Sequence, residues 1–162
     1  MVDWALKNIP PSSNPAILEV GSGNGTLLLG LLEAGYDGST LYGVDCSEGA
    51  ISLARAVAES RGGSNITFSQ CDFLVDEPMK HESTEQRPAV WDLIMDKGTY
   101  DAIALGTKDT DGRSPAIHYP GRLARLLTPG GTFLITCWFT TSRKCRVLLT
   151  TVLQHVTSQR MS

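Results

Sequence analysis

The sequence has no long apolar run, and this absence narrows the class of protein to which it can belong. No stretch reaches the roughly 18 apolar residues that a helix needs to cross a bilayer. Residues 1–10 also lack the basic region and apolar core of a secretory signal peptide. We therefore expect a cytoplasmic protein with no membrane partner.

Basic residues are not in excess either. The 14 Lys and Arg residues are outnumbered by 17 Asp and Glu residues, which gives a formal net charge of -3. A surface that binds nucleic acid needs clustered positive charge to neutralise phosphates. The composition therefore disfavours nucleic acid as a partner.

Cysteine and histidine are scarce. The four cysteines, Cys46, Cys71, Cys137 and Cys145, show no CxxC spacing, and only three histidines accompany them. Zinc sites use closely spaced Cys and His ligands. The sequence therefore predicts no metal site, and it predicts reduced cysteines that serve in packing.

What the sequence does contain is an alternation of short apolar runs and amphipathic stretches over its 162 residues. This alternation is typical of β-α-β units, in which a mostly parallel sheet is buried between two layers of helices. We therefore predict a single α/β domain with a doubly wound sheet. Its parts are a partial leader helix and loop (1–15), a ligand-binding core (16–139) and an atypical C-terminal helix (140–162).

The individual elements are predicted from turn residues and periodicity. Strands are expected at 16–20, 40–44, 65–69, 90–95 and 132–139, and helices at 2–9, 25–34, 47–60, 121–127 and 143–156. In the helix over 47–60, the side chains expected to face the sheet are Ile51, Leu53, Ala54 and Val57. With only a helix after it, the strand 132–139 would form the edge of the sheet, where unpaired backbone groups invite association.

A glycine-rich turn follows the first predicted strand, between Glu19 and Gly25. Gly21, Gly23 and Gly25 stand at alternate positions, where the backbone can turn with positive φ and a ligand can approach closely. The dinucleotide-binding fingerprint GxGxxG requires a third glycine where this chain has Thr26. The spacing therefore departs from that of a nicotinamide-binding loop. A tight strand-to-helix turn without a ligand is the structural alternative.

Asp45 ends the second predicted strand, twenty residues after Gly25. In open α/β sheets a carboxylate at this place accepts hydrogen bonds from the two hydroxyls of a ribose. This position predicts a ligand that contains a nucleoside, without choosing the cofactor. The alternative is that Asp45 only supports the N-terminus of the next helix, beside Ser47.

A third group of residues, from Asp96 to Ile103, follows the fourth predicted strand and reads Asp-Lys-Gly-Thr-Tyr-Asp-Ala-Ile. Ligands bind outside the carboxyl ends of the strands in such sheets, so Asp96 is expected beside the glycine turn. With Glu19 and the glycines, this run resembles the class I S-adenosylmethionine-dependent methyltransferases, which have a Rossmann-like fold. The greatest similarity is to the eukaryotic protein-lysine methyltransferases that act on translation elongation factor 1-alpha. It extends over about residues 2–136 and includes Pro129-Gly130-Gly131-Thr132 before the fifth strand.

The resemblance implies S-adenosyl-L-methionine as the cofactor and elongation factor 1-alpha as the protein substrate, methylated on a lysine. It implies that Glu19 and the three glycines hold the methionine moiety. It further implies that Asp45 binds the ribose and that Asp72 reaches the adenine amino group. Cys46 and Phe73 are expected to pack against the adenine. The alternative for Asp72 is a loop residue without a ligand.

Asp96 and Tyr100 are the catalytic candidates. A lysine amine has a reference pKa of about 10.4 and must lose its proton before it attacks a methyl group, so the site must favour the neutral amine. Asp96 is expected to orient the amine through a hydrogen bond, and Tyr100 is expected to line the lysine channel. The structural alternative for Asp96 is a cap of the turn at Gly98 and Thr99.

The chain also departs from this family in two places. The resemblance implies a longer leader before the first strand and an antiparallel strand pair that completes a seven-stranded sheet. Here the sequence predicts only a helical stretch after residue 141. Two other functions therefore remain open: a methyltransferase acting on another protein or a small molecule, and a cofactor-binding domain without transfer activity.

Overall fold

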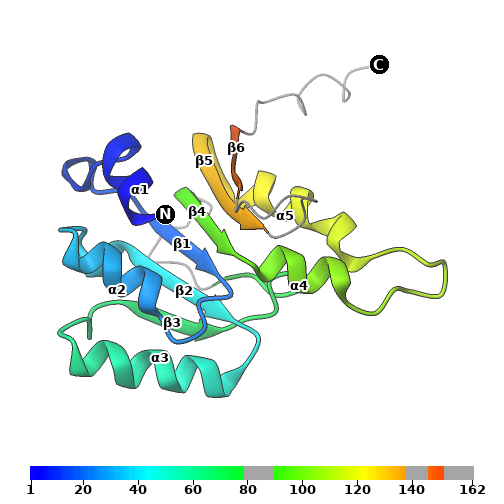
Figure 1. Cartoon of the computed structure of the whole chain (residues 1–162), viewed down its shortest axis with the longest axis horizontal. Helices are drawn as coiled ribbons and strands as arrows, with labels where there is room; N and C mark the ends of the chain where they lie inside the picture. The colour runs from blue at the N-terminus through cyan, green and yellow to red at the C-terminus, as the bar shows by residue number, and fades with distance from the viewer. Residues whose placement is uncertain (79–89, 138–145, 152–162) are drawn as a thin grey trace.

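The computed structural model describes residues 1–78, 90–137 and 146–151, and these residues form one six-stranded sheet (Figure 1). Its strands are β1 (Ile17–Val20), β2 (Leu41–Asp45), β3 (Thr67–Gln70), β4 (Trp91–Lys97), β5 (Leu127–Cys137) and β6 (Arg146–Thr151). The strand order is β3-β2-β1-β4-β5-β6. All pairs are parallel except β5 with β6. The mostly parallel sheet that the sequence predicts is thus confirmed.

Helices cover both faces of the sheet. α1 (Val2–Asn8), α2 (Thr26–Glu33) and α3 (Glu48–Ser60) lie on one face, and α4 (Thr99–Leu105) and α5 (Tyr119–Leu126) lie on the other (Figure 1). The connections include the short 3-10 turns η1 (Pro11–Ser13), η2 (Gly38–Thr40) and η3 (Pro115–His118). The fold is therefore doubly wound. Within the described part of the chain, every helix is too short or too polar to span a bilayer.

The central strands bury alternate side chains in two separate cores. Ile17 of β1 and Leu93 of β4 pack against α2 and α3, whereas Leu18 and Ile94 face the side covered by α5, and all four are fully buried. Parallel strands buried on both faces are apolar along their whole length for this reason. Each fully buried side chain of this size stabilises the fold by about 1.5–3 kcal/mol. Glu19 is the polar exception in β1.

α3 shows how local sequence sets a helix. Ser47 caps its N-terminus, because the serine hydroxyl accepts a hydrogen bond from the Ala50 N–H at 3.3 Å. Ile51 and Ala54 are buried, as predicted. Leu53 is 53% exposed, so the prediction that it faces the sheet was wrong. It follows Ile51 by two residues, which turns its side chain to the opposite side of the helix.

The C-terminal region corrects a predicted element. Residues 146–151 form β6, antiparallel to β5, where a helix over 143–156 was predicted. The register pairs Cys137 with Arg146 and Thr132 with Thr151. Valine and threonine favour strands, and pairing with β5 satisfies backbone groups that a helix packed on the sheet face would leave without partners. The rest of the predicted helix, 143–145 and 152–156, lies outside the described residues.

β6 also changes the position of β5 in the sheet. β5 pairs with β4 on one side and with β6 on the other. The prediction that β5 forms an edge was therefore wrong over the described residues. Among the described residues, β6 is the one antiparallel strand, where the resemblance implies an antiparallel pair.

Candidate functional site

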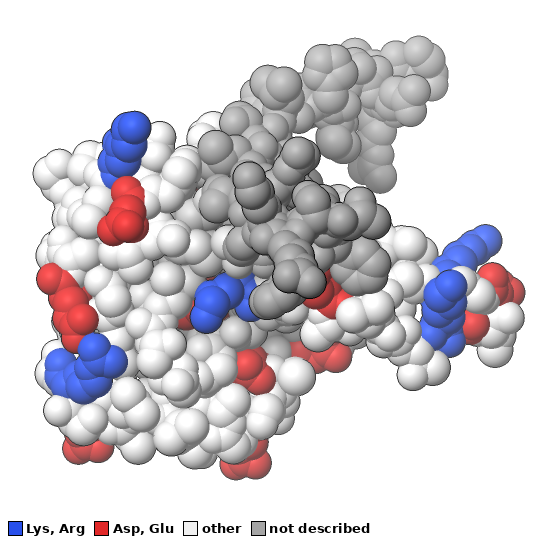
Figure 2. Space-filling model, in the orientation of Figure 1, with Lys and Arg blue, Asp and Glu red and all other residues white. Residues whose placement is uncertain are grey.

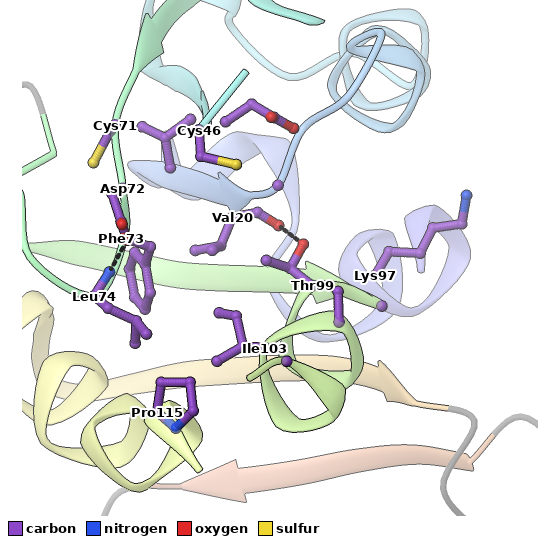
Figure 3. Close-up of a pocket in the computed structure, with 16 residues that line it drawn as sticks. Val20, Cys46, Cys71, Asp72, Phe73, Leu74, Lys97, Thr99, Ile103 and Pro115 are labelled. Atoms are coloured by element: carbon purple, nitrogen blue, oxygen red, sulfur yellow. Dashed lines mark hydrogen bonds between the residues drawn. The ribbon is translucent and has the colours of Figure 1, made fainter. Parts of the chain in front are cut away.

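A pocket of about 520 Å³ opens at the carboxyl ends of β1, β2 and β4. The chain leaves β1 toward β2 on one side and later returns to β4 on the other, so the winding changes direction here. Doubly wound sheets bind their ligands at such a switch point. In Figure 3, Phe73 and Leu74 form one wall, and Thr99 and Ile103 lie opposite them.

The glycine turn connects β1 to α2 at the edge of this pocket. A Cβ atom on Gly21, which has a φ of +68°, would lie 1.8 Å from the Thr99 Oγ1 atom. A Cβ atom on Gly25 would lie 2.7 Å from the Phe68 ring. Both glycines are therefore required by the packing of the protein itself. Gly23 differs, because no described atom beyond its two chain neighbours lies within 4 Å of the position that its Cβ would take.

Asp45 lines the pocket and connects the glycine turn to α3. Its Oδ2 atom accepts a hydrogen bond from the Gly23 N–H at 3.0 Å, and its Oδ1 atom accepts one from the Ser47 N–H at 2.9 Å. An ionised carboxylate has about four acceptor positions, so further hydrogen bonds can be accepted from ligand hydroxyls. Asp45 can therefore support the start of α3 through Ser47 and still bind the hydroxyls of a ribose.

Residues 71–74 form the wall that follows β3. Asp72 is exposed, and its Oδ1 atom accepts a hydrogen bond from the Leu74 N–H at 3.0 Å (Figure 3). Phe73 is 5% exposed, and together with Leu74 it gives the wall an apolar surface. Cys46, at the end of β2, lines the same pocket. The structure therefore brings together the residues predicted around an adenine.

Two cysteines, Cys46 and Cys71, line the pocket. Burial raises the pKa of the Cys71 thiol to about 11, so this side chain stays protonated and serves in packing. Cys46 is exposed. Among the described residues, no three His, Cys, Asp or Glu side chains are grouped so that they could hold a metal ion.

Glu19 lies beneath the glycine turn and is 3% exposed. Burial raises its pKa to about 8, and the positive charge of Lys97 and a hydrogen bond from the Leu28 N–H offset part of this effect. The Oε2 atom has no hydrogen-bond partner among the described residues. A positive charge brought to the glycine turn would lower the pKa of Glu19 and let it ionise.

Asp96 is fully buried and lies behind the pocket lining rather than in it. Its Oδ1 atom accepts a hydrogen bond from the Thr99 N–H at 2.7 Å. Its Oδ2 atom accepts one from the Tyr100 N–H at 2.9 Å and another from the Tyr119 hydroxyl. These contacts supply partners for the first N–H groups of α4. They agree with the structural alternative, in which Asp96 caps the turn at Gly98.

The other catalytic candidate, Tyr100, is half-buried beside Tyr119. The centroids of the two rings are 5.3 Å apart, and the rings meet edge to face. Thr99, and not Tyr100, lines the pocket. The Thr99 hydroxyl donates a hydrogen bond to the Val20 carbonyl at 3.0 Å (Figure 3). The structure therefore brings Asp45, Asp72 and the glycine turn to one cavity and sets the two catalytic candidates behind it.

Sequence reasoning missed the helix that forms one side of the pocket. Thr99 and Ile103 of α4 line the cavity, and Pro115 of η3 lies at its margin. The short run 99–105 is too brief for a clear helical periodicity. The sequence signal for the start of α4 is Asp96, three positions before Thr99, followed by Gly98. In the structure Gly98 has a φ of +90°, and Asp96 accepts a hydrogen bond from the Thr99 N–H.

Comparisons with known proteins cover most of the chain. A family model described as a methyltransferase domain matches residues 11–159. The chain is 34% identical over 156 residues to the protein-lysine N-methyltransferase EFM4 of Saccharomyces cerevisiae, an alignment that covers 93% of this chain and 64% of that protein. It is 37% identical over 125 residues to the EEF1A lysine methyltransferase 2 of Danio rerio, covering 77% of this chain and 48% of that protein. The chain thus spans about half to two thirds of the length of these relatives.

A solved structure gives a comparison of the fold. The crystal structure of the PH0226 protein from Pyrococcus horikoshii OT3 matches with a TM-score of 0.60 and 21% sequence identity. The match covers 83% of this chain and 53% of that one. The Rossmann-like arrangement of the sheet is therefore shared with a known structure.

Proposed function

Because the chain belongs to the methyltransferase domain family, we propose that it transfers a methyl group from S-adenosyl-L-methionine to a lysine of a protein. The observation that carries this proposal is that Asp45, Asp72 and Gly21 line the same cavity at the switch point of the sheet. Its volume of about 520 Å³ lies in the range of small-molecule sites.

The residues around the cavity fit this cofactor. Asp45 keeps acceptor positions for the two ribose hydroxyls, while Phe73 and Cys46 offer surface for the adenine ring. Asp72 would accept a hydrogen bond from the adenine amino group, and Gly21 lines the cavity at the glycine turn, where the methionine portion would bind. Glu19, whose Oε2 atom has no hydrogen-bond partner among the described residues, would be stabilised in its ionised form by a positive charge bound at the glycine turn. When bound, the cofactor supplies a methyl group on a positively charged sulfur.

The acceptor side requires a neutral lysine amine. A carboxylate exposed in the site would stabilise the ammonium form and raise the pKa of the amine. Asp96 avoids this effect, because its carboxylate is buried and turned toward three donors at the start of α4. We therefore propose that Asp96 acts by holding Thr99 and Tyr100 in place, with Tyr100 beside the path of the lysine.

Elongation factor 1-alpha is the protein substrate that we propose. The name of the relative from Danio rerio identifies it as an EEF1A lysine methyltransferase, and the same signature after β4 suggested this substrate from the sequence. On the face drawn in Figure 2, Lys and Arg side chains lie among Asp and Glu side chains, with no continuous basic surface for a phosphate backbone. The cytosol is the proposed compartment.

The direct test combines the purified chain with tritiated S-adenosyl-L-methionine and recombinant elongation factor 1-alpha. We expect label on a lysine of the elongation factor, and calorimetry should show binding of S-adenosylhomocysteine in preference to NAD. If a cytosolic extract is added and label enters small solutes alone, the protein substrate is contradicted. Binding without any transfer would favour a cofactor-binding domain.

A pair of glycine variants identifies the site of binding. Gly23 and Gly35 both have positive φ and open space around the Cβ position, at +53° and +98°. Valine therefore strains the backbone at both positions. Only Gly23 lies in the turn at the pocket, so Gly23→Val should abolish cofactor binding and Gly35→Val should retain it. Equal affinities in the two variants would contradict this site.

A further inference from the structure

Arg122 of α5 is an arginine buried behind the pocket, with 6% of its surface exposed. Its Nε atom donates to the Phe73 carbonyl at 2.8 Å, and its Nη1 atom donates to the Glu77 carboxylate at 2.9 Å. Its Nη2 atom donates to the Asp76 carbonyl. A buried guanidinium is tolerated only when its donors are paired. Here all of these partners belong to one segment, residues 73–77.

Phe73 is held through its ring as well as through its carbonyl. The guanidinium carbon of Arg122 lies 5.7 Å from the centroid of the Phe73 ring, within the range of a cation–π contact. The Tyr119 ring, also from α5, has its centroid 4.9 Å from that of Phe73. One helix therefore sets the position of the side chain that forms a pocket wall.

The wall segment, residues 71–77, has few other hydrogen bonds to the described body of the protein. Hydrogen bonds from Leu74, Val75 and Asp76 to Asp72 fold the segment on itself. Beyond Cys71, which donates to the Asp45 carbonyl, its described hydrogen bonds to other elements come from Arg122 and Arg125. The Arg125 contact, to Glu77, is long at 3.5 Å, and its side chain is 62% exposed.

We propose that Arg122 is a positioning residue for cofactor recognition, which acts through Phe73 and Asp76 to hold the adenine side of the pocket. The inference rests on the proposed function, since it takes an adenine nucleoside as the ligand. The carboxylate of Asp72 can accept a hydrogen bond from the amino group of adenine. Hypoxanthine carries a carbonyl oxygen at that place, which a carboxylate repels. Discrimination between these two bases therefore depends on a wall that stays in place.

Two methionine variants on the same helix test this role. Arg122→Met keeps much of the side-chain length but removes the donors, and Arg125→Met is the matched control one turn later. Calorimetry gives the affinities for S-adenosylhomocysteine and S-inosylhomocysteine. We expect the ratio of these affinities to fall at least about tenfold in Arg122→Met and to stay at the wild-type value in Arg125→Met. A merely structural role would weaken both ligands equally and leave the ratio unchanged.

A second measurement needs no ligand. Cys71 lies at the start of the wall and is 4% exposed, whereas Cys46 across the pocket is exposed. Mass spectrometry after iodoacetamide treatment measures alkylation at each position. We expect the Cys71 rate to rise at least about tenfold in Arg122→Met, because the opening of a segment follows its local stability. The Cys46 rate should not change.

The outcomes separate the two levels of the proposal. If Arg122→Met does not fold, Arg122→Lys keeps the charge, loses the forked donors, and should show the same changes at smaller size. An unchanged base ratio together with an unchanged Cys71 rate in a folded variant would overturn the role of Arg122. Failure of the wild-type chain to bind S-adenosylhomocysteine would instead overturn the proposed function, and the Cys71 rates would then decide alone whether Arg122 holds the wall.

Discussion

Glu19 carries a carboxyl group into the core beneath the glycine turn, where water cannot solvate its charge. Burial raises its pKa from 4.5 to about 8, against the opposing effect of Lys97. The folded protein therefore binds this proton more tightly than the unfolded chain does. The contribution of the protonated Glu19 to the free energy of unfolding is fully present below a pH of about 4.5 and is lost as the pH rises through about 8.

Replacing Glu19 with glutamine should remove this dependence. Glutamine has nearly the shape of the protonated acid and cannot ionise, so Glu19→Gln should have a stability close to that of wild type at pH 5. As the pH rises from 5 to 8, the free energy of unfolding of the variant should increase relative to that of wild type by on the order of a few kcal/mol. Urea unfolding at stepped pH measures this difference. Glu59→Gln, which removes an exposed carboxyl, is the control, and parallel curves for Glu19→Gln and wild type would contradict the buried charge.

Two helices meet at Asp96. α4 begins with N–H groups directed at this carboxylate, and α5 contributes the Tyr119 hydroxyl from the other side. Burial raises the pKa of Asp96, and the hydrogen bonds lower it in part. The position of α4, and with it of Thr99 in the pocket wall, therefore depends on a buried acid that α5 helps to satisfy.

The Tyr119 hydroxyl should accordingly stabilise the junction of α4 and α5. Tyr119→Phe keeps the ring beside Phe73 and Tyr100 but leaves the buried carboxyl with one donor fewer. We expect a loss of about 1–3 kcal/mol in the free energy of unfolding. Tyr36→Phe is the control, because its hydroxyl donates at 2.8 Å to the Ile9 carbonyl, which is uncharged, and should cost about 0.5–1.5 kcal/mol. Equal losses of stability in the two variants would show that the hydrogen bond from Tyr119 to Asp96 contributes no more than one to an uncharged carbonyl.

At the scale of the whole molecule, the described part of the sheet ends in β3 on one side and β6 on the other. β5 is eleven residues long, and its sequence from Thr132 to Cys137 contains no charged residue. An exposed strand of this composition pairs readily with another chain. By pairing with β5, β6 covers that edge.

Removal of β6 should therefore change the state of the molecule in solution. A chain of residues 1–145 exposes the edge of β5, whereas a chain of residues 1–151 keeps β6. We expect the shorter chain to associate more strongly and to melt at a lower temperature. Size-exclusion chromatography with light scattering over a wide range of concentration measures the first effect, and calorimetry measures the second. Identical behaviour of the two chains would show that β6 is dispensable.

Features with local causes could be predicted from the sequence. The alternation of apolar runs indicated the parallel strands, and Ser47 marked the start of α3. Gly21, Asp45 and Asp72 line one cavity, because the carboxyl ends of parallel strands meet at the same edge of a sheet, and their contacts with a ligand stay a prediction. In each case the residues concerned either interact with close neighbours in sequence or follow a general rule of the fold.

Features with distant partners became clear only in the folded chain. Asp96 accepts a hydrogen bond from the hydroxyl of Tyr119, 23 residues later, and Arg122 donates one to the carbonyl of Phe73, 49 residues earlier. Residues 146–151 form a strand because β5 offers unpaired backbone groups, although their apolar spacing also fits a helix. A short segment differs little in free energy between helix and strand. Its contacts with remote elements therefore decide which conformation it adopts.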